Sequence, residues 1–133
     1  MKILIATDGS ASALEAVEFG LDLAQEQDAW PVFIHVAPHD RASVPLVEAL
    51  RLAAEKNVPA RTEHVSGSPA EAIVGYAHAI EAELIVVGSR GHGTAASMLL
   101  GSVSRGVLRR AQCPVVVVRG APERVEAIAA PNQ

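Results

Sequence analysis

Cysteine and aromatic residues are scarce in this sequence, and their scarcity excludes several kinds of site. Among its 133 residues there is one cysteine, Cys113, and only 3% of the residues are aromatic. One cysteine allows neither an internal disulfide nor a zinc site built from cysteines. Because Cys113 precedes the apolar run Val115 to Val118, we interpret it as a small core residue rather than as a reactive thiol.

Basic residues are outnumbered, and long apolar runs are missing. The chain carries 11 Lys and Arg against 15 Asp and Glu, a formal net charge of −4, which argues against a general nucleic-acid surface. No apolar run reaches the length of a transmembrane helix, and the apolar stretch at the N-terminus is too short for a signal peptide. We therefore expect a cytoplasmic protein that binds neither nucleic acid nor a membrane.

Half of the residues are hydrophobic, and they occur in short runs that alternate with helical patterns. A run without polar alternation, such as Ile3 to Ile5, is typical of a parallel strand buried on both faces. The pattern predicts strands at about residues 2–7, 30–36, 61–65, 84–87 and 115–118, with a helix after each of the first four. Parallel strands joined by right-handed helical crossovers form an α/β fold, here a three-layer α/β/α sandwich with a five-stranded parallel sheet.

Two of the predicted helices have recognisable starting residues. Ser10 or Ser12 can cap the first helix. Ser68, Pro69 and Glu71 form the pattern of a capping box with proline at the first helical position.

A glycine-rich segment follows the fourth predicted strand. Gly88, Gly91 and Gly101, with Ser102 after the last, have the spacing G-x2-G-x9-G-S, which is neither the Walker A pattern nor the dinucleotide fingerprint. Glycine permits positive φ and lets a ligand approach the main chain, and Ser102 can cap the next helix or donate a hydrogen bond to a phosphate oxygen. The spacing alone fits a phosphate-binding loop and a structural crossover loop with a serine cap equally well.

Several motifs resemble those of the ATP-binding branch of the universal stress proteins. They are ILIATDGS at residues 3–10, GSPAEAIVGYA at 67–77, AELIVVGSRG at 82–91, and the glycine spacing followed by SVSRGVLRRAQCPVVVV. These motifs occur in the family's order and span roughly residues 1–119. The resemblance implies a Rossmann-like fold of the adenine nucleotide alpha-hydrolase-like kind, and it implies ATP binding because the glycine motif is intact.

The resemblance also implies where the nucleotide lies. In an open α/β sheet a ligand binds at the carboxyl ends of the strands where the strand order reverses, which in the family's fold is between the first and fourth strands. Asp8 would accept a hydrogen bond at the adenosine end, the main chain at Val36 would border the adenine, and the glycines would hold ribose and phosphates. The complete candidate set is Ala6, Thr7, Asp8, Val36, Gly88, Arg90, Gly91, Gly101, Ser102, Val103 and Ser104.

Some of these residues have an ordinary structural interpretation as well. Asp8 and Gly9 are a common turn pair that can cap the following helix, and Arg90 fits a solvated loop as well as a phosphate contact. His35 lies on a predicted strand and is interpreted as a core histidine. The other histidines show no metal-ligand spacing, so no metal site is predicted.

The sequence favours a nucleotide-binding regulator over an enzyme. Phosphoryl transfer needs charge neutralisation, a metal site and a group that orients the nucleophile, whereas this chain has no P-loop lysine and one carboxylate, Asp8, near the predicted site. We expect an ATP-binding regulatory protein with at most weak hydrolysis, the ATP carrying Mg or Mn on its triphosphate; the resemblance implies a stress-response role. Two alternatives remain: a slow ATP-hydrolysing enzyme with Asp8 as metal ligand, and a dimeric interaction module without nucleotide.

The end of the chain bears on oligomeric state. We expect residues 1–119 to form a single nucleotide-binding domain and residues 120–133 to be a C-terminal tail, either with a short helix around residues 123–129 or disordered. If Val115 to Val118 is the last strand of the sheet, its bare apolar edge needs a cover. A second copy related by a two-fold axis provides one, and the resemblance implies such a dimer, so we predict a homodimer through this strand.

Overall fold

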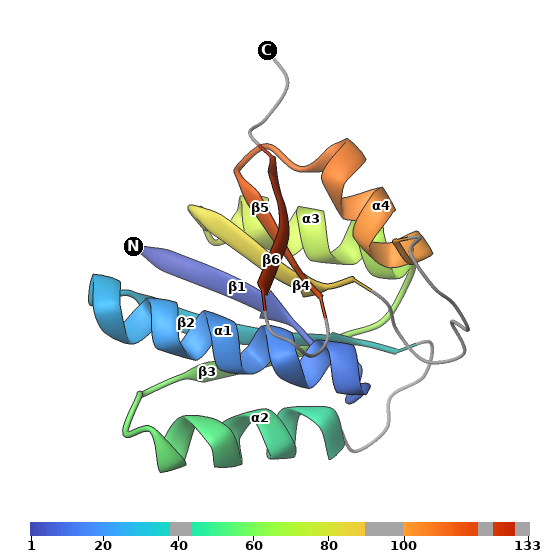
Figure 1. The fold of residues 1–133 in the computed structure, drawn as a ribbon. Helices are drawn as coiled ribbons and strands as arrows, with labels where there is room; N and C mark the ends of the chain where they lie inside the picture. The colour runs from blue at the N-terminus through green and yellow to red at the C-terminus, as the bar shows by residue number, and fades with distance from the viewer. Residues whose placement is uncertain (38–43, 90–99, 120–123, 130–133) are drawn as a thin grey trace.

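In the computed structural model, which describes residues 1–37, 44–89, 100–119 and 124–129, helices and strands alternate along the chain (Figure 1). The strands are β1 (Lys2–Ala6), β2 (Trp30–Val36), β3 (Arg61–Val65), β4 (Leu84–Gly88), β5 (Val115–Arg119) and β6 (Arg124–Ala129). The helices are α1 (Ala11–Gln27), α2 (Val44–Glu55), α3 (Pro69–Ala79) and α4 (Ser102–Arg110). None of these described helices is both long and apolar enough to cross a membrane.

The strands form one sheet in the order β3-β2-β1-β4-β5-β6. The first five are parallel, which confirms the predicted α/β sandwich with its five-stranded parallel sheet. β1 is paired with β2 on one side and with β4 on the other, so the strand order reverses between β1 and β4. The crevice expected at such a reversal therefore lies at the carboxyl ends of β1 and β4.

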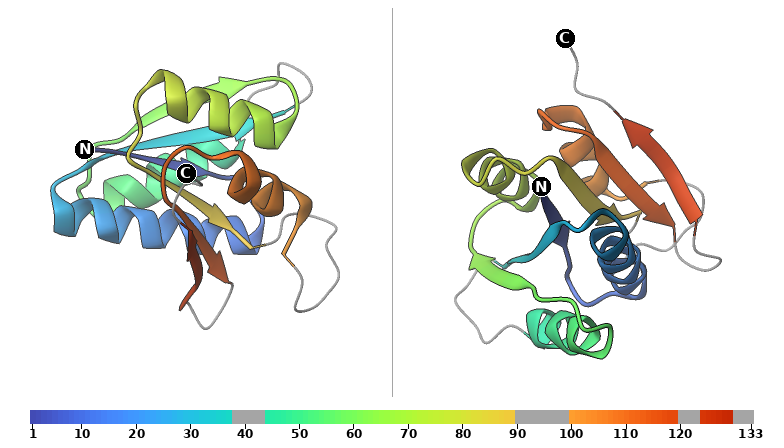
Figure 2. Two further views of the ribbon diagram at one scale, coloured as in Figure 1. Left: turned by 90° about the horizontal axis from the view of Figure 1, so that it is seen from above. Right: turned by 90° about the vertical axis from the view of Figure 1, so that its left-hand side faces the viewer.

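Each face of the sheet is covered by two helices, α1 and α2 on one side and α3 and α4 on the other (Figure 2). Ile3 and Ile5 of β1 pack in the core under α1 and α2, while Leu4 packs in the core under α3 and α4. All three side chains are fully buried, which explains an apolar run without alternation. Cys113 is half-buried against the second core, and burial raises the pKa of its thiol.

The C-terminal segment corrects two expectations. The helix considered around residues 123–129 is wrong, because Arg124–Ala129 forms β6, antiparallel to β5. β5 is consequently not the edge of the sheet, since β4 pairs with it on one side and β6 on the other. The physical reason is that a short helix is marginal by itself, whereas a strand beside β5 satisfies a row of backbone hydrogen-bonding groups.

The helix caps follow the sequence in part. Ser10 is the N-cap of α1, and its hydroxyl accepts a hydrogen bond from the Ala13 N–H at 3.2 Å. Ser68 and Pro69 begin α3 as predicted, but in the described part of the chain the Ser68 side chain makes no capping hydrogen bond, so the expected capping box is not formed. The Glu71 Oε2 lies 3.8 Å from the Arg110 Nη2 of α4.

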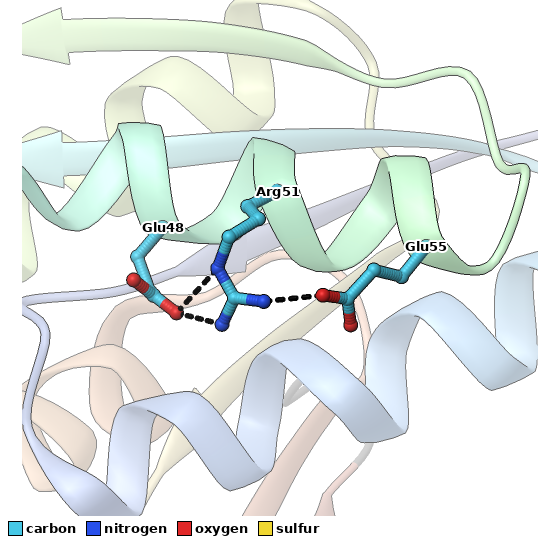
Figure 3. A network of polar contacts seen from close by, with 3 residues as sticks. All are labelled: Glu48, Arg51 and Glu55. Carbon is cyan, nitrogen blue, oxygen red and sulfur yellow. Dashed lines mark hydrogen bonds and ion pairs between the residues drawn. The ribbon is translucent and has the colours of Figure 1, made fainter.

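Helix α2 has one buried and one exposed face. Leu46, Ala49 and Ala53 pack in the core under the sheet. On the exposed face Arg51 forms hydrogen bonds and ion pairs with Glu48 and Glu55, one turn before and one turn after it (Figure 3).

Candidate functional site

A cavity of about 270 Å³ opens at the carboxyl ends of β1 and β4, where the strand order reverses. The ends of both strands, the start of α3 and the start of α4 contribute to its walls. Open α/β sheets bind their ligands at this place, because the crossovers on either side of the reversal leave a crevice. The cavity is therefore the candidate site.

Most of the residues predicted from the sequence line this cavity. The structure brings together Ala6, Thr7, Asp8, Val36, Gly88, Gly101, Ser102, Val103 and Ser104. Arg90 and Gly91 lie outside the described residues, so their predicted roles stay predictions.

Several lining residues were not predicted. They are Ala13, Ile34, Pro69, Ile73, Val87 and Ser89. Ile34 and Val87 carry a signal that could have been used, because each lies near the carboxyl end of a predicted strand next to β1. Pro69 and Ile73 carry none, because only the packing of α3 against the sheet brings them to the opening.

A tight turn at the end of β1 positions Asp8. The Asp8 Oδ1 accepts a hydrogen bond from the Ser10 N–H at 2.9 Å, and the Thr7 Oγ1 accepts one from the Gly9 N–H at 3.1 Å. Gly9 has φ of 82°, a left-handed conformation that favours glycine. The structural interpretation of Asp8 and Gly9 as a turn before a helix is thus correct, and the same turn places Asp8 on the cavity wall.

Gly88, at the end of β4, has a packing reason for being glycine. A Cβ atom there would lie 2.7 Å from the Ser12 Oγ and 2.8 Å from the Ser12 carbonyl oxygen, so the absence of a side chain lets α1 approach β4. Gly101 also differs from the expectation of a left-handed loop glycine, since its φ is −71° and its ψ 168°, an extended conformation open to other residues. The predicted approach of a ligand to the main chain at Gly101 stays a prediction.

The start of α4 is tied directly to the end of β4. Gly101 is the N-cap of α4 and Ser102 its first residue, so of the two roles considered for Ser102 the capping role is wrong. The Gly101 N–H donates to the Ser89 carbonyl at 2.6 Å, and the Ser104 hydroxyl lies 3.1 Å from the same carbonyl and 3.0 Å from that of Gly101. The Ser104 hydroxyl therefore has a structural role. Ser104 lines the cavity as a residue of the first turn of α4.

Val103 and Val107 lie one turn apart on α4 but differ in burial. Val107 is fully buried, whereas Val103, in the first turn, is 37% exposed and lines the cavity.

The two sides of the cavity differ in electrostatic character. Asp8 supplies a carboxylate at the end of β1, and the first turn of α4 presents N–H groups that have no acceptor within the helix, together with the positive end of the helix dipole. Ala6, Ile34 and Val36, from β1 and β2, add apolar surface to the cavity wall. The arrangement can accept a hydrogen bond at one end and hold an anion at the other. Among the described residues no three His, Cys, Asp or Glu side chains are grouped to hold a metal ion.

Two histidines are stacked beside the site, a contact that the sequence interpretation missed. The rings of His35 on β2 and His64 on β3 have centroids 5.3 Å apart and planes 15° apart. Burial lowers the pKa of His35 from its ordinary value, the neighbouring His64 lowers this pKa further, and the Asp8 carboxylate acts in the opposite direction. The two residues are directly opposite in the register of parallel strands, which an alignment of the predicted strands could have shown.

Comparisons with known proteins agree with this fold. The model of the universal stress protein family matches residues 1–50 and 41–119. A universal stress protein of Methanocaldococcus jannaschii is 33% identical over 138 aligned positions, covering 89% of this chain and 81% of the relative. A universal stress protein of Bacillus subtilis is 34% identical over 145 aligned positions, covering 89% of this chain and 98% of the relative.

Solved structures give the same result. A universal stress protein in complex with cAMP superposes on this chain with a TM-score of 0.76 at 31% identity, covering 88% of this chain and 94% of that one. The family model, the two relatives and this structure confirm the resemblance carried by the sequence motifs. This chain belongs to the universal stress protein family.

Proposed function

We propose that this protein binds an adenine nucleotide in the cavity between β1 and α4, and that it is an ATP-binding regulator with a role in the stress response. The observation that carries the proposal is that one cavity combines the Asp8 carboxylate with the N-terminus of α4. We further propose that residues 1–119 are the nucleotide-binding unit.

The adenosine end of the ligand would lie at the end of β1. Asp8 keeps a carboxylate on the cavity wall, where it can accept a hydrogen bond from a ribose hydroxyl or an adenine amino group. Ala6, Ile34 and Val36 offer apolar surface for the base, in keeping with the mostly apolar lining of small-molecule sites.

The phosphates would lie at the start of α4. The first-turn N–H groups and the Ser102 hydroxyl are donors there, and the helix dipole favours negative charge. From the sequence motif alone, Arg90 and Gly91 would complete this end. ATP with Mg or Mn on its triphosphate is the ligand that the intact glycine motif favours, and the 31% identical relative solved with cAMP supports an adenine nucleotide.

The described residues that line the cavity support the proposal of weak or no hydrolysis. Asp8 is the one carboxylate among the described residues that line the cavity, and its Oδ1 already accepts from the Ser10 N–H. A single carboxylate supplies neither the metal clamp nor the oriented nucleophile of rapid phosphoryl transfer.

The direct test is thermal unfolding with Mg-ATP, ADP, AMP, cAMP and GTP, on protein freed of bound nucleotide. A ligand at 100 times its dissociation constant stabilises the native state by about 2.7 kcal/mol, which raises the midpoint of a domain of this size by about 5 to 15 °C. We expect this rise with ATP and a much smaller one with GTP.

Gly101→Asp is the informative variant. Aspartate is a favourable N-cap and Gly101 has an extended backbone, so the unliganded protein should be as stable as the parent or slightly more stable. The negative charge of the new aspartate at the phosphate end should abolish the ATP-induced rise of the unfolding midpoint.

Asp8→Asn tests the adenosine end of the site. It should reduce the rise of the unfolding midpoint with every adenine nucleotide. Its matched control is Glu26→Gln, which changes an exposed carboxylate at the far end of α1.

Three outcomes would contradict parts of the proposal. If no adenine nucleotide at millimolar concentration shifted the unfolding midpoint, the cavity would not be a nucleotide-binding site. Equal shifts with AMP and ATP would remove the preference for a triphosphate. Steady phosphate release that is lost in Asp8→Ala would show an enzyme instead.

A further inference from the structure

The buried polar residues in the described part of the chain are gathered at one place. Each is at most 9% exposed, and they are Thr7, Ser10, Ser12, Ser89 and Ser104. They lie directly after β1 and β4 or at the starts of α1 and α4, which is the end of the sheet that carries the cavity. Burying a hydroxyl costs free energy unless it is hydrogen-bonded, so the partners of these hydroxyls indicate what they do there.

Ser89 is held from three elements. Its N–H donates to a carbonyl of β5 at 2.8 Å, and its hydroxyl lies 3.5 Å from that of Ser12 in α1. Its carbonyl accepts from the Gly101 N–H at 2.6 Å and from the Ser104 hydroxyl at 3.1 Å, both at the start of α4. Residues 90–100 lie between Ser89 and Gly101 in the sequence, so these bonds join the two ends of the glycine-rich segment.

Ser104 is the side chain that makes this junction. Its hydroxyl lies 3.0 Å from the Gly101 carbonyl in addition to its 3.1 Å contact with the Ser89 carbonyl. The residue is 2% exposed and belongs to the first turn of α4. A serine has one hydroxyl proton to donate, and here both acceptors within its reach are carbonyl groups at the ends of the same segment. The contact therefore ties the first turn of α4 to the end of β4.

The position of this turn decides where the donors for an anion lie. The N–H groups of residues 102–104 have no acceptor within the helix, because the first helical hydrogen bond runs from the Arg105 N–H to the Gly101 carbonyl at 3.0 Å. Hydrogen bonds weaken steeply as their geometry worsens, and a displacement of about 1 Å at a site is costly. Whatever fixes the first turn of α4 therefore fixes how strongly it holds an anion.

We propose that Ser104 is a positioning residue for the phosphate end of the cavity, because its hydroxyl holds the first turn of α4 against Ser89 and so aims the N–H groups of residues 102–104 at a triphosphate. This inference rests on the proposed function, since it takes an adenine nucleotide as the ligand. The adenosine end depends on a different contact, the hydrogen bond from the Ser10 N–H to Asp8, so the role of Ser104 is specific to the phosphates.

Ser104→Ala is the direct test. Both carbonyl groups keep a donor in this variant, Ser89 from the Gly101 N–H and Gly101 from the Arg105 N–H, so no buried carbonyl is left unpaired. Titration calorimetry with Mg-ATP, and an NMR titration with adenosine, which has no phosphate, give the two dissociation constants on the full chain freed of nucleotide. We expect Mg-ATP to bind about tenfold more weakly to the variant and adenosine to stay within about twofold of the parent.

Two further variants separate positioning from stability. Ser104→Thr keeps the hydroxyl, and threonine in a helix can donate to a carbonyl three or four residues before it, so Mg-ATP should bind as it does to the parent. Leu46→Ala changes a core residue of α2 that does not line the cavity. It should lower stability and leave the ratio of the two dissociation constants unchanged.

The variants also define what would overturn the positioning role. An equal loss of affinity for Mg-ATP and adenosine in Ser104→Ala would show a general effect on the site, and no loss would show that the hydroxyl is dispensable. A Ser104→Thr protein of parental stability that binds Mg-ATP as weakly as Ser104→Ala would show that the hydroxyl is not the group that matters.

The failure of the proposed function is seen separately, in the parent. A parent that binds neither Mg-ATP nor adenosine would refute nucleotide binding, and the contact of Ser104 is then judged without ligand by hydrogen exchange of the Gly101 amide, which donates to Ser89. We expect this amide to exchange about tenfold faster in Ser104→Ala than in the parent or in Ser104→Thr. Equal rates in the three proteins would show that the hydroxyl does not hold the turn.

Discussion

A methyl group added at Gly88 would meet the Ser12 hydroxyl at 2.7 Å and the Ser12 carbonyl carbon and oxygen at 2.8 Å. Backbone atoms in the first turn of α1 cannot give way as the end of a flexible side chain can. We therefore expect Gly88→Ala to lower the free energy of unfolding by about 1 to 3 kcal/mol, as overpacking does elsewhere. Urea denaturation measures this change.

Gly75 is the matched control for Gly88. It lies within α3, and an added Cβ meets no atom within 4 Å. Gly75→Ala should raise stability by about 0.5 to 1 kcal/mol, because alanine favours the helix. If the two substitutions changed stability equally, the close contact between α1 and β4 would not be the reason for glycine at position 88.

His35 gives a prediction about pH. Its pKa is lowered in the folded protein, first by burial and then by His64, with Asp8 opposing, so the unfolded chain binds the proton more readily. Stability should therefore be complete above the ordinary histidine pKa of about 6.5 and decline as the pH falls below it. His35→Gln should reduce this decline between about pH 7.5 and 5.5.

The matched control for His35 is His78→Gln, an exposed position on α3. Because other groups also titrate, the quantity to compare is the slope of unfolding free energy against pH in the parent and in each variant. A slope unchanged by His35→Gln would show that this half-buried, stacked histidine does not contribute to the slope.

At the scale of elements, helix α2 allows the stability contribution of a buried side chain to be compared with that of exposed ion pairs. Leu46 is 7% exposed and packs in the core, so Leu46→Ala should cost about 2 to 4 kcal/mol. Arg51 lies on the exposed face between Glu48 and Glu55, so Arg51→Gln should leave the unfolding midpoint nearly unchanged in physiological salt. Thermal unfolding of both variants tests this. A large fall of the unfolding midpoint in Arg51→Gln that persists at high salt would contradict the view that these exposed ion pairs contribute little to stability.

The elements also show where sequence patterns succeed and fail. Strands β1, β2, β4 and β5 were predicted because burial on both faces leaves continuous apolar runs. β6 was missed because its sequence, RVEAIA, contains good helix formers and alternates polar and apolar residues only over its first four positions. Pairing with β5 decides its conformation, and strand preference depends strongly on such context.

At the scale of the whole molecule, the order of strands predicts an order of stability. β1 is paired on both sides and buried on both faces, whereas β3 is an outer strand of the sheet. We expect the amides of residues 3–6 to exchange with solvent only on global unfolding, and those of residues 61–65 at an opening free energy lower by about 1 kcal/mol or more. Native-state hydrogen exchange measures both.

The same experiment reports on β6. If it covers β5 reversibly, the amides of residues 124–129 should be the least protected among the strands. Equal protection in β1, β3 and β6 would show that the sheet opens as one unit and that β6 does not leave separately.

The sequence by itself determined the parallel strands, the crossover helices and the family. Through the resemblance of its motifs to that family, it also indicated most of the residues that line the cavity. Periodicity, turn residues and motif spacing are local properties of the chain, so they can be read without coordinates.

Only the tertiary structure decided which segments meet. It brought Pro69 and Ile73 to the cavity, stacked His35 on His64 and placed β6 on the edge of β5. It also gave Gly88 a packing role, by setting α1 directly against β4. These contacts join residues far apart in the chain, and their energies depend on shape and burial that appear only when the sheet and its helices are packed.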